Sequence, residues 1–193
     1  MLNKSVVERV LLRASETGAD FAELFVEQGR DLHLSMGAGK VNAAASGMES
    51  GAGVRLFKND LTAYAYTNDL SEAGLMKAAA KAAAAISDSN LIKNINLVDY
   101  SIENIHQIEQ CLFGKSRGEL IDFMRRGSDR LYAESSLIRR ADVSLSEKQR
   151  HILVANSDGL WAEDDRNYAR YSLSVIAEDG TEKFSGFKTR GAM

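Results

Sequence analysis

Residues 116–159, which read SRGELIDFMRRGSDRLYAESSLIRRADVSLSEKQRHILVANSDG, contain the pattern that decides the fold. Ser116 followed three residues later by Glu119 is a capping-box pattern, and we expect a helix from there to about Ala133. After this helix the apolar residues recur at every second position, which is typical of a strand with one buried face. Asn156-Ser157-Asp158-Gly159 is a strong turn signal. The stretch therefore predicts one helix followed by antiparallel strands.

The strands continue to the end of the sequence. The alternation predicts one strand over about 137–146 and a second over His151–Ala155. A longer strand is expected over Tyr168–Ala177, and Glu178-Asp179-Gly180 turns the chain into a last strand that ends near Phe187.

Upstream, a helix followed by strands occurs a first time. Asn3 is suited to cap a helix that stops at Gly18. The apolar period then changes to two, which predicts a strand over Asp20–Glu27 with both faces partly apolar. A turn around Gly29 and a return strand over 32–36 complete a predicted hairpin.

The next segment contains further turns and a second helix. Residues 37–53 are rich in Gly, Ala and Ser, and we expect a short strand between turns there. Gly53–Phe57 and Leu61–Thr67 predict two more strands. Asp69-Leu70-Ser71-Glu72 is another capping-box pattern, opening an alanine-rich helix that runs to about Ile86.

Both parts of the chain thus combine a helix with a meander of antiparallel strands. We predict an α+β fold in which helices pack on antiparallel sheets. The expected sub-halves are about 1–87 and about 115–193, joined by a linker of about 88–114 within a single domain of residues 1–193.

Composition excludes several classes of protein. The 193 residues are 45% hydrophobic and 26% charged, and the net charge of −3 makes a nucleic-acid-binding surface unlikely. The longest apolar run, Ala78–Ile86, is far shorter than the roughly 20 residues of a membrane span. The single cysteine, Cys111, rules out an intrachain disulfide and favours a cytoplasmic location. We predict no membrane partner.

The recognised catalytic motifs do not fit this sequence, so we predict neither a catalytic residue nor a metal ligand. Gly37-Ala38-Gly39-Lys40 resembles the end of a phosphate-binding loop, but Val41 stands where Ser or Thr is required, and we interpret it as a turn. The three histidines lack the clustered spacing of a zinc site; they are His33, His106 and His151. We interpret Ser157 and Asp158 as turn residues rather than partners of His151 in a triad. The acidic run 163–165 is interpreted as a hydrated strand end, and three aromatic residues as core or edge residues; they are Trp161, Tyr168 and Tyr171.

Several segments, in order and spacing, resemble the TldD/PmbA family. They are Gly18-Ala19-Asp20-Phe21-Ala22-Glu23-Leu24-Phe25, Gly39-Lys40-Val41, Gly51-Ala52-Gly53-Val54-Arg55-Leu56, Thr62–Ser71, Ile152–Leu160, Asp165-Arg166 and Arg170–Gly180. Their order and spacing hold across nearly the whole chain. The stretch Ala65-Tyr66-Thr67-Asn68-Asp69-Leu70-Ser71 favours the TldD type over the PmbA type.

The resemblance implies a cytosolic zinc metallopeptidase, also called a modulator of DNA gyrase, that pairs TldD-type with PmbA-type subunits and cleaves unfolded peptides. In that family a His-Glu-x-x-x-His motif holds the zinc, and this sequence lacks the motif. We therefore expect a non-catalytic N-terminal domain that binds no zinc itself, the C-terminal zinc-binding domain being absent from this chain. Its expected partners are a PmbA-type subunit or a second copy. The alternative is a stand-alone binding or assembly module of the same fold.

The resemblance also suggests a peptide-binding site on the predicted hairpin Gly53–Thr67. Arg55, Tyr64 and Tyr66 have the spacing to share one face of this hairpin. An extended peptide can add to an exposed strand edge and gain affinity from main-chain hydrogen bonds. The alternative role of the three residues is cross-strand packing on a sheet surface.

Overall fold

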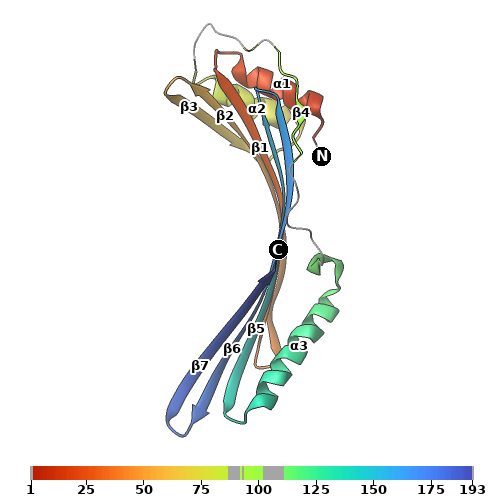
Figure 1. The fold of residues 1–193 in the computed structure, drawn as a ribbon, viewed down its shortest axis with the longest axis vertical. Coiled ribbons are helices and arrows are strands. Elements are labelled where there is room, and N and C mark those ends of the chain that lie inside the picture. Colours follow the sequence, from red (N-terminus) through yellow and green to blue (C-terminus); the bar gives the residue numbers. More distant parts are fainter. Residues whose placement is uncertain (1, 87–91, 93, 102–110, 193) are drawn as a thin grey trace. The chain divides into compact units, whose positions relative to one another are not determined.

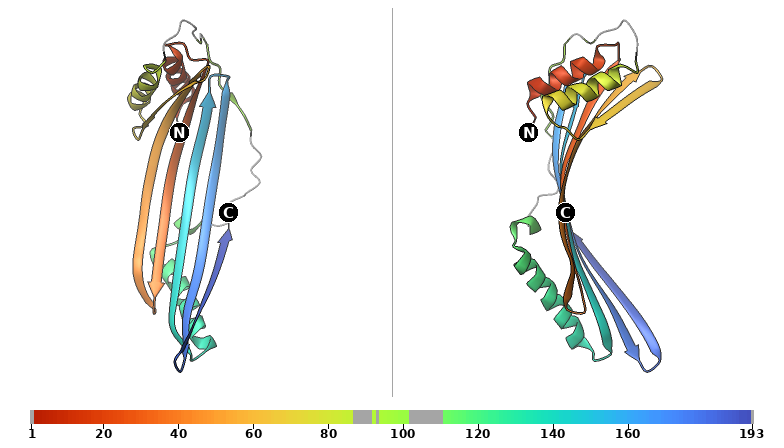
Figure 2. Two further views of the ribbon diagram at one scale, coloured as in Figure 1. Left: turned by 90° about the vertical axis from the view of Figure 1, so that its left-hand side faces the viewer. Right: turned by 180° about the vertical axis from the view of Figure 1, so that it is seen from behind.

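The computed structural model describes residues 2–86, 92, 94–101 and 111–192 and confirms the α+β fold class (Figures 1 and 2). The elements in chain order are α1 (Lys4–Ser15), β1 (Phe21–Gly37), β2 (Lys40–Lys58), β3 (Leu61–Thr67), α2 (Glu72–Ala83), β4 (Val98–Asp99), the 3-10 helix η1 (Leu112–Gly114), α3 (Arg117–Glu134), β5 (Ile138–Asn156), β6 (Leu160–Asp179) and β7 (Glu182–Ala192).

The described strands follow the order β3-β2-β1-β5-β6-β4, with β7 also paired to β6. The β2–β3 and β6–β7 pairs are antiparallel, whereas the two-residue β4 is parallel to β6. The main-chain N–H of Ala38 donates to the carbonyl of Ala141, and that of Ser157 donates to Ala22. These two bonds show that β1 and β5 are antiparallel as well.

The chain forms two compact units that interleave along the sequence. Unit 1 comprises residues 1–29, 49–104 and 151–165; unit 2 comprises residues 30–48, 105–150 and 166–193. Four strands therefore contribute one part to each unit, namely β1, β2, β5 and β6. Each unit thus draws on both predicted sub-halves, and most of the predicted linker 88–114 lies outside the described residues.

In unit 1, α1 and α2 lie together on one face of the strands (Figure 2). Asn3 caps α1 as predicted, because its side chain accepts a hydrogen bond from the N–H of Ser5 at 2.9 Å. The buried residues of α2 are one leucine, one glycine and four alanines, small side chains that let the helix approach the sheet closely. The core of unit 1 includes Val7, Val10, Leu11, Leu24, Val54, Leu56, Leu75 and Trp161.

In the described part of unit 2, the α-helix that covers the strands is α3. The predicted capping box is present: Ser116 accepts from the N–H of Glu119, and the Glu119 carboxylate accepts from the N–H of Ser116. A side-chain carbon at Gly127 would collide with the hydroxyl of Tyr171, so this glycine permits the close approach of helix and sheet. The buried apolar residues are Leu32, Leu34, Met36, Leu120, Met124, Val143 and Leu145.

A buried carboxylate anchors η1 in unit 2. Glu147 is fully buried and accepts hydrogen bonds from the main-chain N–H groups of Leu112 at 3.0 Å and Phe113 at 2.8 Å. The side-chain amide of Asn167 donates to the same carboxylate at 2.8 Å. Main-chain and amide donors thus replace the water that the carboxylate loses on burial.

Some of the predicted strand breaks are wrong, whereas the turns at 37–40, 156–159 and 178–180 are present. The chain does not turn at Gly29; β1 runs straight through this buried residue to Gly37. The Gly/Ala/Ser-rich segment 37–53 belongs mostly to the continuous β2, and the strands expected over 137–146 and 151–155 are one strand, β5. Weak strand formers stay extended here because neighbouring strands form main-chain hydrogen bonds with them. Sequence propensity alone does not include this contribution.

Smaller differences concern element ends. Ser71, not Asp69, is the N-cap of α2, because its hydroxyl accepts from the N–H of Gly74. The Asp69 carboxylate accepts from the N–H of Ser71 instead, which fixes the residue before the helix. The helix ends at Ala83 rather than Ile86. At the other end of the chain, β6 begins at Leu160 rather than 168 and β7 continues past Phe187 to Ala192.

No helix built from the described residues combines the length and the apolar character needed to cross a lipid bilayer.

Candidate functional site

The three predicted peptide-binding residues lie on one exposed face of unit 1, which we call the β2–β3 face. On β3, Ala63 and Ala65 point into the core, and the alternating Tyr64 and Tyr66 point outward with exposed fractions of 63% and 74%. Arg55 on β2 is also exposed. The alternation of a strand therefore brings the three side chains to the same side.

Strand register sets their spacing. Arg55 is the cross-strand partner of Tyr64, and Gly53 is the partner of Tyr66. The ring of Tyr64 occupies the space beside Gly53, because a side-chain carbon there would stand 2.5 Å from the tyrosine hydroxyl. A glycine at position 53 thus gives an aromatic ring a place to lie flat on the sheet.

Arg55 is held by neighbours on two strands. Its guanidinium donates to the Glu23 carboxylate on β1 at 2.7 Å and lies 5.2 Å from the centre of the Phe57 ring. The ion pair fixes the guanidinium in place, and the fork keeps further N–H donors that this single bond does not use. The residue can therefore donate to a ligand without losing its position.

Further residues of the face were not predicted as site residues. The ring of Phe21 lies 5.9 Å from that of Phe57, and Glu23 contributes the carboxylate that holds Arg55. Phe25 is also outward on β1 and 39% exposed. The sequence indicated these residues only through the partly apolar second face of the strand predicted over residues 20–27. Such a face is typical of a strand that is also partly covered on its outer side.

The β2–β3 face lies beside a strand edge. Among the described residues β3 pairs with β2 alone, since it ends the strand order. An edge strand presents unpaired main-chain N–H and C=O groups to an extended chain. The face therefore combines a main-chain template with aromatic and guanidinium surfaces, a combination that suits binding rather than bond cleavage.

The structure separates the residues of the rejected triad. The hydroxyl of Ser157 accepts a hydrogen bond from the N–H of Ala22 at 3.0 Å, which ties the turn to β1. The N–H of Asp158 donates to the Asn156 side chain, as expected for a turn residue. His151 instead contacts Asp165 through Nδ1 at 2.8 Å. The interpretation of Ser157 and Asp158 as turn residues is confirmed.

The remaining candidates are also placed. Ala38 and Gly39 have φ angles of 49° and 74°, so the segment around them is the predicted turn, between β1 and β2. Trp161 is buried in unit 1, whereas Tyr171 packs 5.1 Å from the ring of Phe123 and burial raises its pKa. Tyr168 is exposed.

Zinc donors do not gather in the described part of the chain. No group of three or more His, Cys, Asp or Glu side chains within residues 2–86, 92, 94–101 and 111–192 has the arrangement of a metal site. His106 lies outside these residues. The described donors thus do not fit the metal that the resemblance implies, and the absence of zinc ligands from this chain stays a prediction.

Two family models match the chain in succession. The model of PmbA/TldA metallopeptidase domain 1 matches residues 22–86, and that of the PmbA/TldA metallopeptidase central domain matches residues 112–193.

Curated relatives give the same result. A metalloprotease TldD homolog of Buchnera aphidicola is 30% identical over 141 residues, covering 72% of this chain and 29% of the relative. A metalloprotease TldD homolog of Haemophilus influenzae is 26% identical over 178 residues, covering 89% of this chain and 36% of the relative. The chain thus spans about a third of the length of these relatives.

Solved structures share the fold. A proposed modulator of DNA gyrase from Bacteroides thetaiotaomicron superposes with a TM-score of 0.76 at 11% identity, covering 98% of this chain and 44% of that one. The corresponding protein of Thermotoga maritima gives 0.76 at 14% identity, covering 98% and 43%. TldE from Thermococcus kodakarensis gives 0.71 at 17% identity, covering 95% and 42%.

Proposed function

The chain belongs to the TldD/PmbA family, and from this premise we propose that it is the non-catalytic N-terminal domain of a TldD-type zinc metallopeptidase acting on unfolded peptides in the cytoplasm. In this role the domain holds an extended substrate segment and contributes to the walls of the peptide chamber. The names of the two metalloprotease relatives support the activity of the whole protein. The chain's single cysteine supports the location.

One observation carries the proposal. Strand β3, which ends the strand order of the described residues, also carries the exposed tyrosines of the β2–β3 face. A substrate strand beside β3 gains main-chain hydrogen bonds that do not depend on its sequence. Tyr64 and Tyr66 add apolar contact area with little loss of side-chain entropy. Such a site accepts many unfolded peptides and rejects folded proteins, whose strands are already paired.

The proposal assigns no bond-breaking step to this chain. Zinc supplies a bound water and polarises the peptide carbonyl in metallopeptidases, and it needs three protein ligands. The described donors form no such set. What this chain contributes is the position and the extended conformation of the substrate.

The proposal includes assembly with a PmbA-type subunit or a second copy. Residues 40–48 of β2 form an edge in unit 2 that carries one charge, Lys40, and no proline. Except for Ala43, all of these residues are exposed. Edges that must stay single are normally blocked by charges or proline. This unblocked edge supports pairing with another subunit.

Peptide binding by matched tyrosine variants tests the proposal. The probe is a fluorescent, uncharged twelve-residue peptide, blocked at both ends and without regular structure in solution. Tyr66→Ser should weaken binding of this peptide by about fivefold to tenfold, because it removes a contact of roughly 1 kcal/mol or more. The control is Tyr100→Ser, since Tyr100 is 64% exposed but belongs to neither β2 nor β3.

Circular dichroism establishes that both variants fold. Equal affinity of the folded Tyr66→Ser variant and the unaltered protein would overturn the assignment of peptide binding to the β2–β3 face. A similar loss in Tyr100→Ser would also overturn it, because the effect would not be specific to this face.

A further inference from the structure

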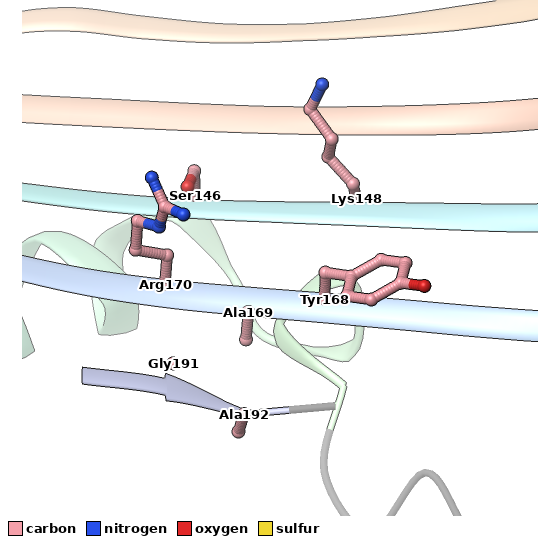
Figure 3. A pocket seen from close by; sticks show the side chains of 7 residues that line it. All are labelled: Ser146, Lys148, Tyr168, Ala169, Arg170, Gly191 and Ala192. Carbon is pink, nitrogen blue, oxygen red and sulfur yellow. The ribbon is translucent and has the colours of Figure 1, made fainter. Parts of the chain in front are cut away.

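Unit 2 contains a hollow whose residues are remote in sequence from the β2–β3 face. It has a volume of about 700 Å³ and is lined by parts of β5, β6 and β7 (Figure 3). The polar side chains around it are Ser146 and Lys148 of β5 and Tyr168 and Arg170 of β6. None of the described residues that line the hollow is acidic.

The two cations of the hollow are weakly compensated. Arg170 is exposed and makes no ion pair with the residues that the structure describes. The Nζ of Lys148 lies 3.9 Å from Asp31, at the outer limit of an ion pair, and its side chain is 65% exposed. A chain with a net charge of −3 thus carries a local excess of positive charge here.

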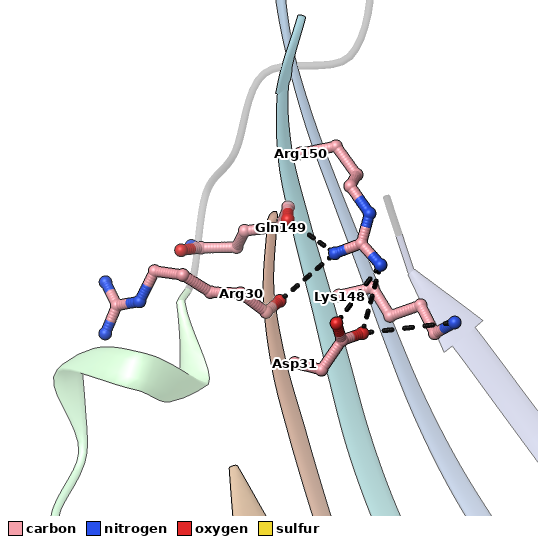
Figure 4. Close-up of polar contacts among 5 residues, drawn as sticks. All are labelled: Arg30, Asp31, Lys148, Gln149 and Arg150. Atoms are coloured by element: carbon pink, nitrogen blue, oxygen red, sulfur yellow. Dashed lines mark hydrogen bonds and ion pairs between the residues drawn. The ribbon is translucent and has the colours of Figure 1, made fainter. Parts of the chain in front are cut away.

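Asp31 does not neutralise Lys148, because another cation already binds it. Arg150 donates through Nη2 to both carboxylate oxygens of Asp31, at 3.2 and 3.1 Å (Figure 4). Its side chain is only 17% exposed, so this charge-assisted pair is shielded from solvent. Lys148 and Arg170 are left as the cations available to a ligand.

A glycine keeps the hollow open beside the guanidinium. Gly191 of β7 is the cross-strand partner of Arg170, and paired residues point to the same face of a sheet. A side-chain carbon at Gly191 would stand 3.6 Å from the carbonyl oxygen of Ala169, an ordinary contact. A larger residue at this position would therefore fill the hollow without straining the backbone.

From this arrangement we infer that the hollow binds a carboxylate of an extended peptide, contributed either by an acidic side chain or by a free C-terminus. The guanidinium fork matches the two oxygens of a carboxylate, and the ammonium and two hydroxyls satisfy its remaining lone pairs. Phosphate sites instead use helix N-termini and clusters of main-chain N–H groups. The described walls of this hollow are strands.

The same surface offers a place for the peptide chain. Among the described residues β7 pairs with β6 alone, which leaves its other edge open to an extended segment. The inference does not rest on the proposed function of the β2–β3 face, because the hollow belongs to the other unit and uses different residues.

The inference is tested by calorimetric titration of the full chain with three peptides. The peptides differ in whether, and where, they carry a carboxylate. The first is acetyl-Val-Thr-Glu-Thr-Val-amide, the second replaces its Glu by Gln, and the third is the Gln peptide with a free C-terminal carboxylate. We expect the first, the third or both to bind at least tenfold more tightly than the second, and the affinity to fall when salt is raised. Whichever of the first and third peptides binds more tightly than the second identifies the source of the carboxylate, side chain or C-terminus.

Two variants of the hollow are compared with matched controls. Arg170→Gln removes the fork and Gly191→Val fills the space, so each should abolish the tenfold preference. Arg190→Gln removes the same charge from the next position of β7, whose partner Tyr171 packs on the side of α3. Gly118→Val adds the same side chain at an exposed glycine of α3, where the nearest atom would be the hydroxyl of Ser116 at 3.9 Å. Both controls should keep the preference.

Equal binding of all three peptides would overturn the inference, as would equal losses in Arg170→Gln and Arg190→Gln. Tighter binding of inorganic phosphate than of any peptide would overturn it in favour of a phosphate site. The variant Tyr66→Ser should keep the carboxylate preference, so that failure of the β2–β3 proposal and failure of this inference give different results.

Discussion

The two compact units use the same strands but are stabilised in different ways. Unit 1 buries a large apolar cluster in which two helices, rich in alanine and valine, cover the sheet. The buried apolar cluster of unit 2 consists of seven described residues, of which Leu120 and Met124 belong to α3 and the other five to the strands. Unit 2 adds a fully buried carboxylate, Glu147, that unit 1 does not match among its described residues. The comparison teaches that one continuous strand can serve both an apolar and a partly polar core.

This difference also assigns different surfaces to the units. In unit 1 the helices leave an aromatic face, which includes Tyr64 and Tyr66. Unit 2 instead presents a hollow lined by the cations Lys148 and Arg170 and by the hydroxyl-bearing residues Ser146 and Tyr168. The two units thus present surfaces of different chemistry, aromatic in unit 1 and cationic in unit 2.

The largest effect is expected for Glu147→Ala. The substitution leaves the N–H groups of Leu112 and Phe113 and the Asn167 amide without their acceptor. At about 1–3 kcal/mol for each of the three orphaned groups, we expect the free energy of unfolding to fall by at least about 3 kcal/mol. Urea unfolding measures this fall, with the exposed Glu134→Ala as control. A loss below about 1 kcal/mol would show that unit 2 does not depend on its polar anchor.

A matched pair on one strand sharpens the comparison. Leu24 and Leu34 both lie on β1 and are fully buried, the first in unit 1 and the second in unit 2. We expect each Leu→Ala change to cost about 3 kcal/mol. Amide hydrogen exchange should accelerate chiefly in the unit that carries the cavity, because each leucine packs within its own cluster. Equal acceleration in both units would show that they unfold as one.

Helix caps provide a smaller test. Ser71 caps α2 in unit 1 and Ser116 caps α3 in unit 2. Replacing either serine by Ala should cost about 1 kcal/mol, measured as a lowered Tm, whereas Gly should cost only a few tenths. We expect Ser116→Ala to speed amide exchange in the first turn of α3 more than Ser71→Ala does in α2, since fewer apolar contacts hold α3. The reverse order would contradict the comparison.

The smallest effect is a pH dependence. Hydrogen bonds with Ser116 lower the pKa of Glu119 below its ordinary value of 4.5. The main-chain hydrogen bond makes the larger contribution and the side-chain hydrogen bond the smaller one. A lowered pKa in the folded state means that this stabilisation is present above pH 4.5 and is lost as pH falls through the folded-state pKa. Glu119→Gln should therefore flatten the fall in Tm between pH 5 and pH 3 (range chosen about the pKa of an ordinary carboxyl). A slope equal to that of the unaltered protein would refute this.

Local signals predicted the helices better than the strands. The caps at Asn3 and Ser116 and the turn at 156–159 depend on neighbouring residues, so the sequence alone was sufficient. The continuity of β1 through Gly29 depends on hydrogen bonds with strands that are distant in the sequence. No local pattern contains that information.

The candidate sites follow the same rule. Alternation was enough to predict that Arg55, Tyr64 and Tyr66 share a face, which the register confirms. The partner of Arg55 is Glu23 on the neighbouring strand β1, 32 residues earlier in the sequence, and the alternation within residues 53–67 did not predict it. Likewise the hollow around Arg170 exists because β5, β6 and β7 meet there, and the sequence did not single out any cation of this group.

The four strands that belong to both units limit how this gene can change. Neither unit is encoded by one contiguous segment of the gene. Recombination therefore cannot replace a unit as a module. A one-residue insertion inside β1 or β5 would turn every later side chain of that strand to the opposite face. Length changes are tolerated at the hairpin ends, near Gly39, Gly159 and Gly180. Relatives should therefore vary in length at these turns while their strand lengths remain constant.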